Sequence, residues 1–67
     1  MKLSTRNQLA GKVTDVKLGT IMSEITVDVG GQSITAAITR ASAEELELTA
    51  GGDVTVLIKA TEVMLGK

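Results

Sequence analysis

The chain has 67 residues, a formal net charge of −1, and no cysteine, histidine or aromatic residue. Without cysteine and histidine it has no disulfide staple or ordinary zinc ligand set, and it lacks the side chains that most often serve in acid–base and nucleophilic catalysis. The interspersed charges form no basic stripe for a nucleic acid, and no apolar run approaches the ~20 residues that span a bilayer. We therefore expect a single domain over residues 1–67 that is cytoplasmic and not an enzyme.

The small size of the domain predicts that it works as an oligomer. A chain of this length buries only about 60% of the surface that it exposes when unfolded. Its core must be built from aliphatic side chains, which each bury less area than an aromatic ring. Small folds usually add disulfides, a structural metal or further subunits. Since the chain has no cysteine for a disulfide and no cysteine or histidine for zinc, we expect it to gain stability from further subunits.

Most of the chain alternates apolar and polar residues with a period of two, which predicts strands with one buried face. A first strand is expected over residues 9–18, bent at Gly11, with Val13 and Val16 on opposite faces. A second is expected over residues 21–29. The inward face of this second strand is predicted to hold Ile21, Ser23, Ile25, Val27 and Val29.

The glycine pair Gly30 and Gly31 predicts a tight hairpin turn, because glycine readily adopts the positive φ angles that such turns need. The third strand then spans residues 32–39 and pairs with the second. The alternation of apolar and polar residues in this strand predicts an inward face of Ile34, Ala36 and Ile38.

After the hairpin the alternation of apolar and polar residues with a period of two gives way to a helical pattern. Ser42 and Glu45 have the S-x-x-E spacing of a capping box, which predicts a helix of two turns with Ala43 and Leu46 facing the barrel. A fourth strand is expected over residues 54–59 and a fifth over residues 61–65. The fold class is thus all-β, an OB-like five-stranded Greek-key barrel with one short helix between strands 3 and 4.

Hydrogen-bond donors are scattered at three places that can converge on an anion, since arginine, lysine, hydroxyl and amide groups all donate. Each has an ordinary alternative role as a solvated charge, a helix cap or a turn residue. Glu44, Glu45 and Glu47 are better explained as the solvated face of the helix than as a cation site. The donors are Ser4, Thr5, Arg6 and Asn7, then Arg40 and Ser42, then Lys59 and Thr61.

Three blocks of the sequence resemble the Mop (molbindin) family, which is related to TOBE-type domains. S-T-R-N-Q-L-A-G-K-V from Ser4 is similar to the family signature S-x-R-N-x-(L/F)-x-G-x-V. I-T-R-A-S-A-E-E-L-E-L from Ile38 and V-L-I-K-A-T-E-V-M-L from Val56 resemble the other two blocks in order and spacing. The resemblance covers essentially the whole chain.

This resemblance implies OB-like subunits that exchange strands within a hexamer, a trimer of dimers. It also implies molybdate or tungstate bound at subunit interfaces for intracellular molybdenum storage and homeostasis. No cation site is implied. The anion-binding positions that carry over are Ser4, Arg6, Arg40, Ser42 and Lys59, with Thr5, Ala60 and Thr61 contributing backbone amides or a hydroxyl. Ala60 stands where some relatives have a serine.

Two other hypotheses about the function of the chain stay open. The chain can be a small oligomeric OB-fold interaction module whose anion site only stabilises the assembly. It can also be an OB-type nucleic-acid-binding module, which predicts salt-dependent retention on single strands. The absence of aromatic rings weighs against the latter, because single-strand binders stack bases on such rings.

Overall fold

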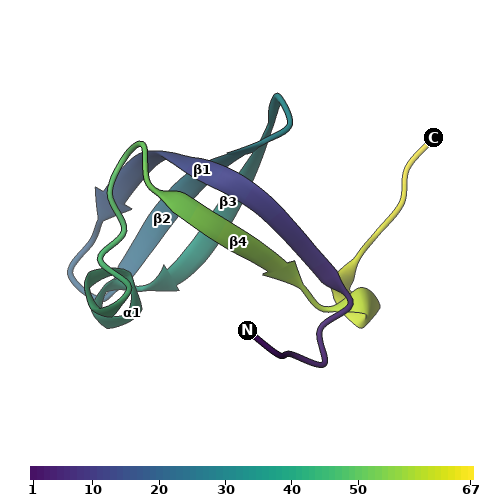
Figure 1. The fold of residues 1–67 in the computed structure, drawn as a ribbon. Helices are drawn as coiled ribbons and strands as arrows, with labels where there is room; N and C mark the ends of the chain where they lie inside the picture. The colour runs from purple at the N-terminus through teal and green to yellow at the C-terminus, as the bar shows by residue number, and fades with distance from the viewer.

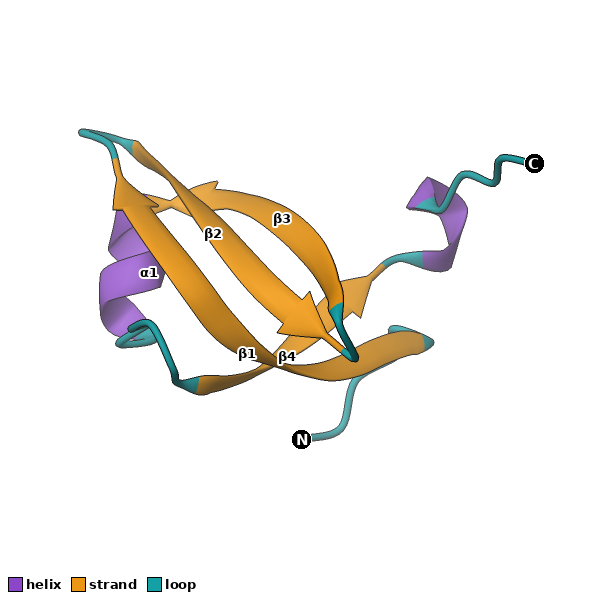
Figure 2. Ribbon diagram, turned by 90° about the horizontal axis from the view of Figure 1, so that it is seen from above, coloured by secondary structure: helices purple, strands orange, loops and turns teal.

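The computed structural model describes all 67 residues and consists of a four-stranded antiparallel sheet with one short α-helix (Figure 1). The spatial order of the strands is β3-β2-β1-β4, so β3 and β4 are the two edges. The sheet is strongly curved (Figure 2), which gives an OB-like barrel that stays open between these edges. The elements are β1 (Asn7–Leu18), β2 (Met22–Val29), β3 (Gln32–Thr39), α1 (Arg40–Glu45), β4 (Asp53–Ile58) and the 3-10 turn η1 (Ala60–Glu62).

A β-bulge in β1 changes the face on which its side chains lie. The pairing of β1 with β2 shifts between Val13 and Asp15, which leaves Thr14 as an extra residue. The Thr14 hydroxyl donates to the carbonyl oxygen of Thr26 at 3.2 Å. Val13 is fully buried and Val16 half-buried, and both pack in the core. The prediction that they lie on opposite faces is therefore wrong, because strict alternation ends at the bulge.

The central hairpin follows the sequence prediction. Gly30 and Gly31 have φ angles of +57° and +88°, as a tight turn requires, and Val29 pairs with Gln32 across it. The bounds of β3 agree with those expected. Gly11 lies where β1 packs closely on β2, since a Cβ there would be 2.6 Å from the carbonyl oxygen of Asp28. Ser23, Ile25 and Val27 are buried and Val29 is half-buried, whereas Ile21 lies outside β2 and is 75% exposed.

The helix begins and ends earlier than predicted. Its N-cap is Thr39, whose Oγ1 accepts a hydrogen bond from the backbone N–H of Ser42 at 3.1 Å. Ser42 is thus inside the helix, and the predicted capping box with Glu45 is wrong. The helix has only six residues, so Leu46 lies beyond it and is 65% exposed. Ala43 is buried against the sheet as predicted.

The predicted fifth strand is wrong for the single chain. After β4 the chain forms η1, and residues 63–67 then run away from the sheet without strand pairing (Figures 1 and 2). The apolar side chains of this tail contact solvent, since Met64 is 92% and Leu65 is 95% exposed. A strand needs a partner for its backbone groups, and the tail finds none within its own chain.

The core is as thin as the composition predicts, because only 5 of 67 residues are fully buried. An apolar groove of about 240 Å³ opens between the two edge strands. No helix is long and apolar enough to cross a membrane. The apolar groove is lined by Ile25, Val27, Ala36, Ile38, Leu46, Leu48, Val54, Thr55, Val56 and Leu57.

Candidate functional site

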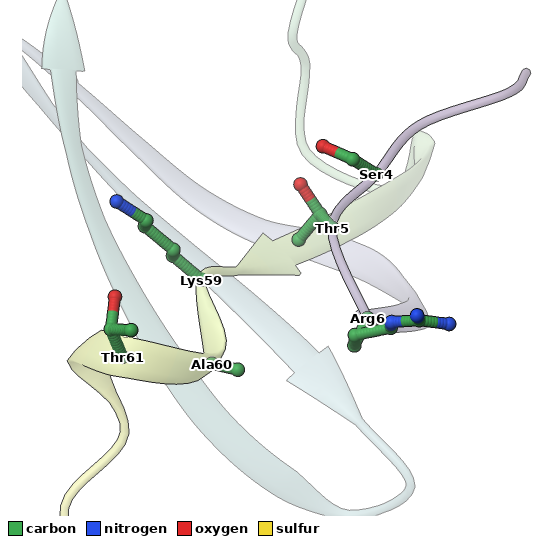
Figure 3. Close-up of a pocket in the computed structure, with 6 residues that line it drawn as sticks. All are labelled: Ser4, Thr5, Arg6, Lys59, Ala60 and Thr61. Carbon is green, nitrogen blue, oxygen red and sulfur yellow. The ribbon is translucent and has the colours of Figure 1, made fainter.

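Six of the eight predicted site residues line one pocket of about 360 Å³ (Figure 3). They come from two segments far apart in sequence, residues 4–6 before β1 and residues 59–61 after β4. These segments meet because β1 and β4 are antiparallel, and Asn7 pairs with Ile58 at the end of the ladder. We call this the terminal pocket. Its lining residues are Ser4, Thr5, Arg6, Lys59, Ala60 and Thr61.

The side chains of the terminal pocket lie in two directions. The Lys59 amine and the hydroxyls of Thr5 and Thr61 extend to the same side, whereas the Arg6 guanidinium extends away from them (Figure 3). Ala60 supplies no polar side-chain atom. Within one chain the pocket thus gathers an ammonium and hydroxyl donors, with the guanidinium at its margin.

Backbone amides add further donors. Ala60 and Thr61 open η1, and the N–H groups at the start of a helical turn have no partner inside it. Neither N–H donates a hydrogen bond elsewhere in the chain. Lys59 is the N-cap of η1 and offers no side-chain hydrogen bond to it. The amides of Ala60 and Thr61 are therefore available to an acceptor in the terminal pocket.

The pocket carries positive charge without compensation. The two ion pairs of the chain join Lys12 to Asp53 and Arg40 to Glu44, so neither Arg6 nor Lys59 is paired. None of the six lining residues is a carboxylate. An arrangement of two cations, hydroxyls and free amides can hold an anion that accepts hydrogen bonds.

Arg40 and Ser42 are not brought to this pocket. They lie in α1, which is near the opposite end of β1 (Figure 1). Arg40 donates from Nε to Oε1 of Glu44 at 2.6 Å, and Ser42 accepts a hydrogen bond from the Thr39 hydroxyl at 2.8 Å. Sequence reasoning missed the partner of Arg40, although the i, i+4 spacing to Glu44 on a helix was a signal for it.

Sequence reasoning named Asn7 as a candidate donor whose ordinary alternative role is that of a turn residue. Asn7 is instead the first residue of β1, and its side-chain amide donates from Nδ2 to the carbonyl oxygen of Ile58 at 3.0 Å. It follows Arg6 directly and so stands between the N-terminal donors and the strand. The only sequence signal for a role here was its place within the R-N step of the first block.

Known proteins match this chain over its full length. The TOBE domain family matches residues 3–65. Molybdenum-pterin-binding protein 1 of Clostridium pasteurianum is 44% identical over 66 residues, which cover 97% of each chain. A solved molybdate-binding protein from Sporomusa ovata is 43% identical with a TM-score of 0.95, covering 100% of both chains. The cytoplasmic molybdate-binding protein ModG, solved with molybdate bound, is 38% identical with a TM-score of 0.86 over 90% of this chain and 43% of its own.

These matches extend over the three sequence blocks on which the resemblance rests, and the backbone agrees with that of the solved relatives. Matches of this identity and coverage show common family, because they extend over both segments of the terminal pocket as well as the sheet. The chain therefore belongs to the TOBE domain family, and the resemblance to the Mop proteins that its sequence predicts is confirmed.

Proposed function

We propose that this protein binds molybdate or tungstate in the terminal pocket and serves intracellular molybdenum storage and homeostasis in the cytoplasm, as a binding protein and not as an enzyme. The observation that carries the proposal is the composition of this pocket, which has two unpaired cations and no carboxylate among its lining residues. The relatives named as molybdate-binding proteins support the choice of ligand.

The chemistry of molybdate suits such a set of donors. At neutral pH molybdate is a fully deprotonated tetrahedral dianion, so each of its oxygens only accepts hydrogen bonds. Arg6 and Lys59 match its two charges, and the amides of Ala60 and Thr61 fill further directions. The chain has no aromatic ring on which a pterin can stack, so the proposed ligand is the oxyanion itself.

Neighbouring copies of the chain are proposed to complete the site. Thr5 is half-buried and the other five lining residues are exposed, so one chain alone leaves the anion open to water and screening salt. A second chain over this pocket would exclude water and strengthen each charged contact. Arg40 and Ser42, which lie away from the pocket of their own chain, would reach the anion only from such a neighbour.

The apolar groove supplies the proposed means of assembly. The tail of one chain, with Val63, Met64 and Leu65 exposed, matches in apolar character the groove between β3 and β4 of another. Docked there as an extended segment, it would add the fifth strand and close the Greek-key barrel. Burying the tail would offset part of the weakness of the thin core. The proposed end state is a hexamer built as a trimer of dimers.

Selectivity among oxyanions tests the proposed ligand. In calorimetric titrations at neutral pH we expect molybdate and tungstate to bind alike, sulfate more weakly and phosphate least. Phosphate carries a proton that needs an acceptor, and the smaller sulfate leaves donors poorly paired, which costs roughly 1 to 3 kcal/mol per buried group. Equal competition by phosphate would contradict a site made of donors. No uptake of molybdate would favour the interaction-module reading.

A further inference from the structure

One side-chain hydrogen bond joins the two segments that form the terminal pocket. Asn7 donates from Nδ2 to the carbonyl oxygen of Ile58 at 3.0 Å, and the bond is partly shielded from solvent. The two residues are also directly opposite each other in the β1–β4 ladder. Arg6 precedes Asn7 and Lys59 follows Ile58, so the bond lies at the end of the ladder, one residue from each of the two proposed charged ligands.

Few other contacts hold the N-terminal donors in place. Residues 1–6 take part in a single hydrogen bond within the chain. Nε2 of Gln8 donates it to the carbonyl oxygen of Thr5 at 2.8 Å. Lys59 and Ala60 accept bonds only within η1, from the N–H groups of Glu62 and Val63. No hydrogen bond joins residues 4–6 to residues 59–61. Among the side-chain hydrogen bonds of the chain, that of the Asn7 amide is thus the one nearest to the pocket that joins its two walls.

We propose that Asn7 is a positioning residue for the anion site, which acts by fixing the spacing of the two backbone segments that carry Arg6 and Lys59. This inference rests on the proposed function. A dianion is held best when its donors are already in place, since binding then loses less side-chain and backbone freedom. Without the tie, the end of the β1–β4 ladder would fray, and the two cations would have to be ordered during binding.

The chain offers a matched control in Ser23. Its hydroxyl donates to the carbonyl oxygen of Ile38, also at 3.0 Å and also partly shielded. Ser23 and Ile38 are likewise opposite each other, in the β2–β3 ladder away from the terminal pocket. Asn7→Ala and Ser23→Ala therefore remove the same kind of bond, and only the former is next to the proposed ligands.

The experiment is a double-mutant cycle read by molybdate calorimetry, with the melting temperature of each variant measured in parallel. We expect Asn7→Ala to weaken molybdate binding about fivefold, the factor that corresponds to one net hydrogen bond. Ser23→Ala should lower the melting temperature and leave affinity unchanged. When Lys59→Met is already present, adding Asn7→Ala should change affinity less than twofold, because the cation it positions is gone.

Each other outcome has a definite meaning. Asn7→Ala with unchanged affinity, or a fivefold loss that persists in the Lys59→Met background, would overturn the positioning role while leaving the proposed function intact. A loss of affinity as large in Ser23→Ala would also overturn it, because stability alone would then explain the effect. If Lys59→Met binds molybdate as tightly as the unaltered protein, or the unaltered protein takes up none, the proposed function fails, and the role of Asn7 fails with it.

Discussion

The two ends of β1 present similar residue types in different states. At the terminal pocket, Arg6 and Lys59 have no ion-pair partner. At the helix end, Arg40 is paired with Glu44 and Ser42 is bonded to Thr39. Donors that are already satisfied inside the chain have little to gain from a ligand, whereas unsatisfied ones retain their full capacity. An unpaired donor is therefore a stronger candidate for anion binding than a donor of the same residue type that already has a partner within the chain.

The largest expected effect comes from removing a cation of the terminal pocket. Lys59→Met or Arg6→Met should weaken molybdate binding at least tenfold, because a charge-assisted hydrogen bond contributes about 1.5 to 3 kcal/mol and about 1.4 kcal/mol is a factor of ten. Arg40→Met should weaken it less than about threefold, since Arg40 is neutralised by Glu44. Calorimetric titration measures all three.

Lys17→Met is the matched control, because Lys17 is exposed and makes no ion pair. It removes the same charge at the end of β1 opposite the terminal pocket, and should leave affinity unchanged. If Arg40→Met weakened molybdate binding as much as Lys59→Met, the distinction between the paired cation at the helix end and the unpaired cations of the terminal pocket would be wrong.

A second effect is confined to the helix end. Thr39→Ala removes the cap of α1 and should lower the free energy of unfolding by about 1 kcal/mol. Molybdate affinity per folded site should stay the same, because the cap is far from the terminal pocket of its own chain and the Ser42 side chain proposed to reach a neighbour's pocket is retained. Chemical denaturation and calorimetry measure the two quantities. Thr20→Ala, at an exposed loop residue without a side-chain hydrogen bond, should be neutral, and equal destabilisation by both changes would contradict the capping role.

A smaller effect is expected just after the helix, where Glu47 has a φ angle of +52°. Left-handed backbone costs a non-glycine residue roughly 1 to 2 kcal/mol, while glycine loses about 0.5 to 1 kcal/mol through its greater freedom when unfolded. Glu47→Gly should therefore stabilise the chain by about 0.5 kcal/mol in denaturant titrations. Glu45→Gly, at a right-handed helical position, should destabilise it, and stabilisation by both would refute the conformational argument.

The smallest effect concerns an exposed ion pair between β1 and β4. The hydrogen bond and charge of Lys12 lower the pKa of Asp53 from its ordinary value. A lowered carboxyl pKa contributes stability above the unfolded-state pKa, about 3.9, and the contribution is lost as the pH falls through the folded-state pKa. Lys12→Met should thus lower the melting temperature slightly at pH 7, and this difference should shrink as the pH falls through the folded-state pKa of Asp53. If the difference in melting temperature between Lys12→Met and the unaltered protein grew as the pH fell, the stabilising effect of the lowered Asp53 pKa would be contradicted.

Local patterns predicted the parts of the fold that local forces determine. The Gly30-Gly31 turn and the alternation of β3 and β4 were readable because each strand has one buried face and each turn a backbone requirement. The bulge at Thr14 was not readable, since a single extra residue leaves no signature in an alternating run. Most residues of the β1–β4 pair were predicted as strands, but Asn7, Gln8 and Asp53 were not, and the pairing became visible only in the fold.

Competition between equivalent residues explains the other errors. Thr39 and Ser42 both suit an N-cap, and the end of β3 favours Thr39, which already has extended backbone. Residues 61–65 have strand-like composition, but a strand needs a partner that a single sequence does not specify. For the site, the scattered donors were readable from the residues and the family resemblance selected among them, and the antiparallel pairing of β1 with β4 grouped six of the selected positions. The Arg40–Glu44 pair shows why residue type alone could not rank the rest.

Native mass spectrometry with and without molybdate tests an anion site shared between chains, because it reads assembly and anion uptake in one measurement. We predict a six-subunit species at micromolar concentration that gains the mass of bound molybdate, and smaller species without the anion-bound mass when residues 63–67 are removed. A monomer at that concentration, or a hexamer whose mass does not change with molybdate, would contradict an anion site completed by neighbouring chains.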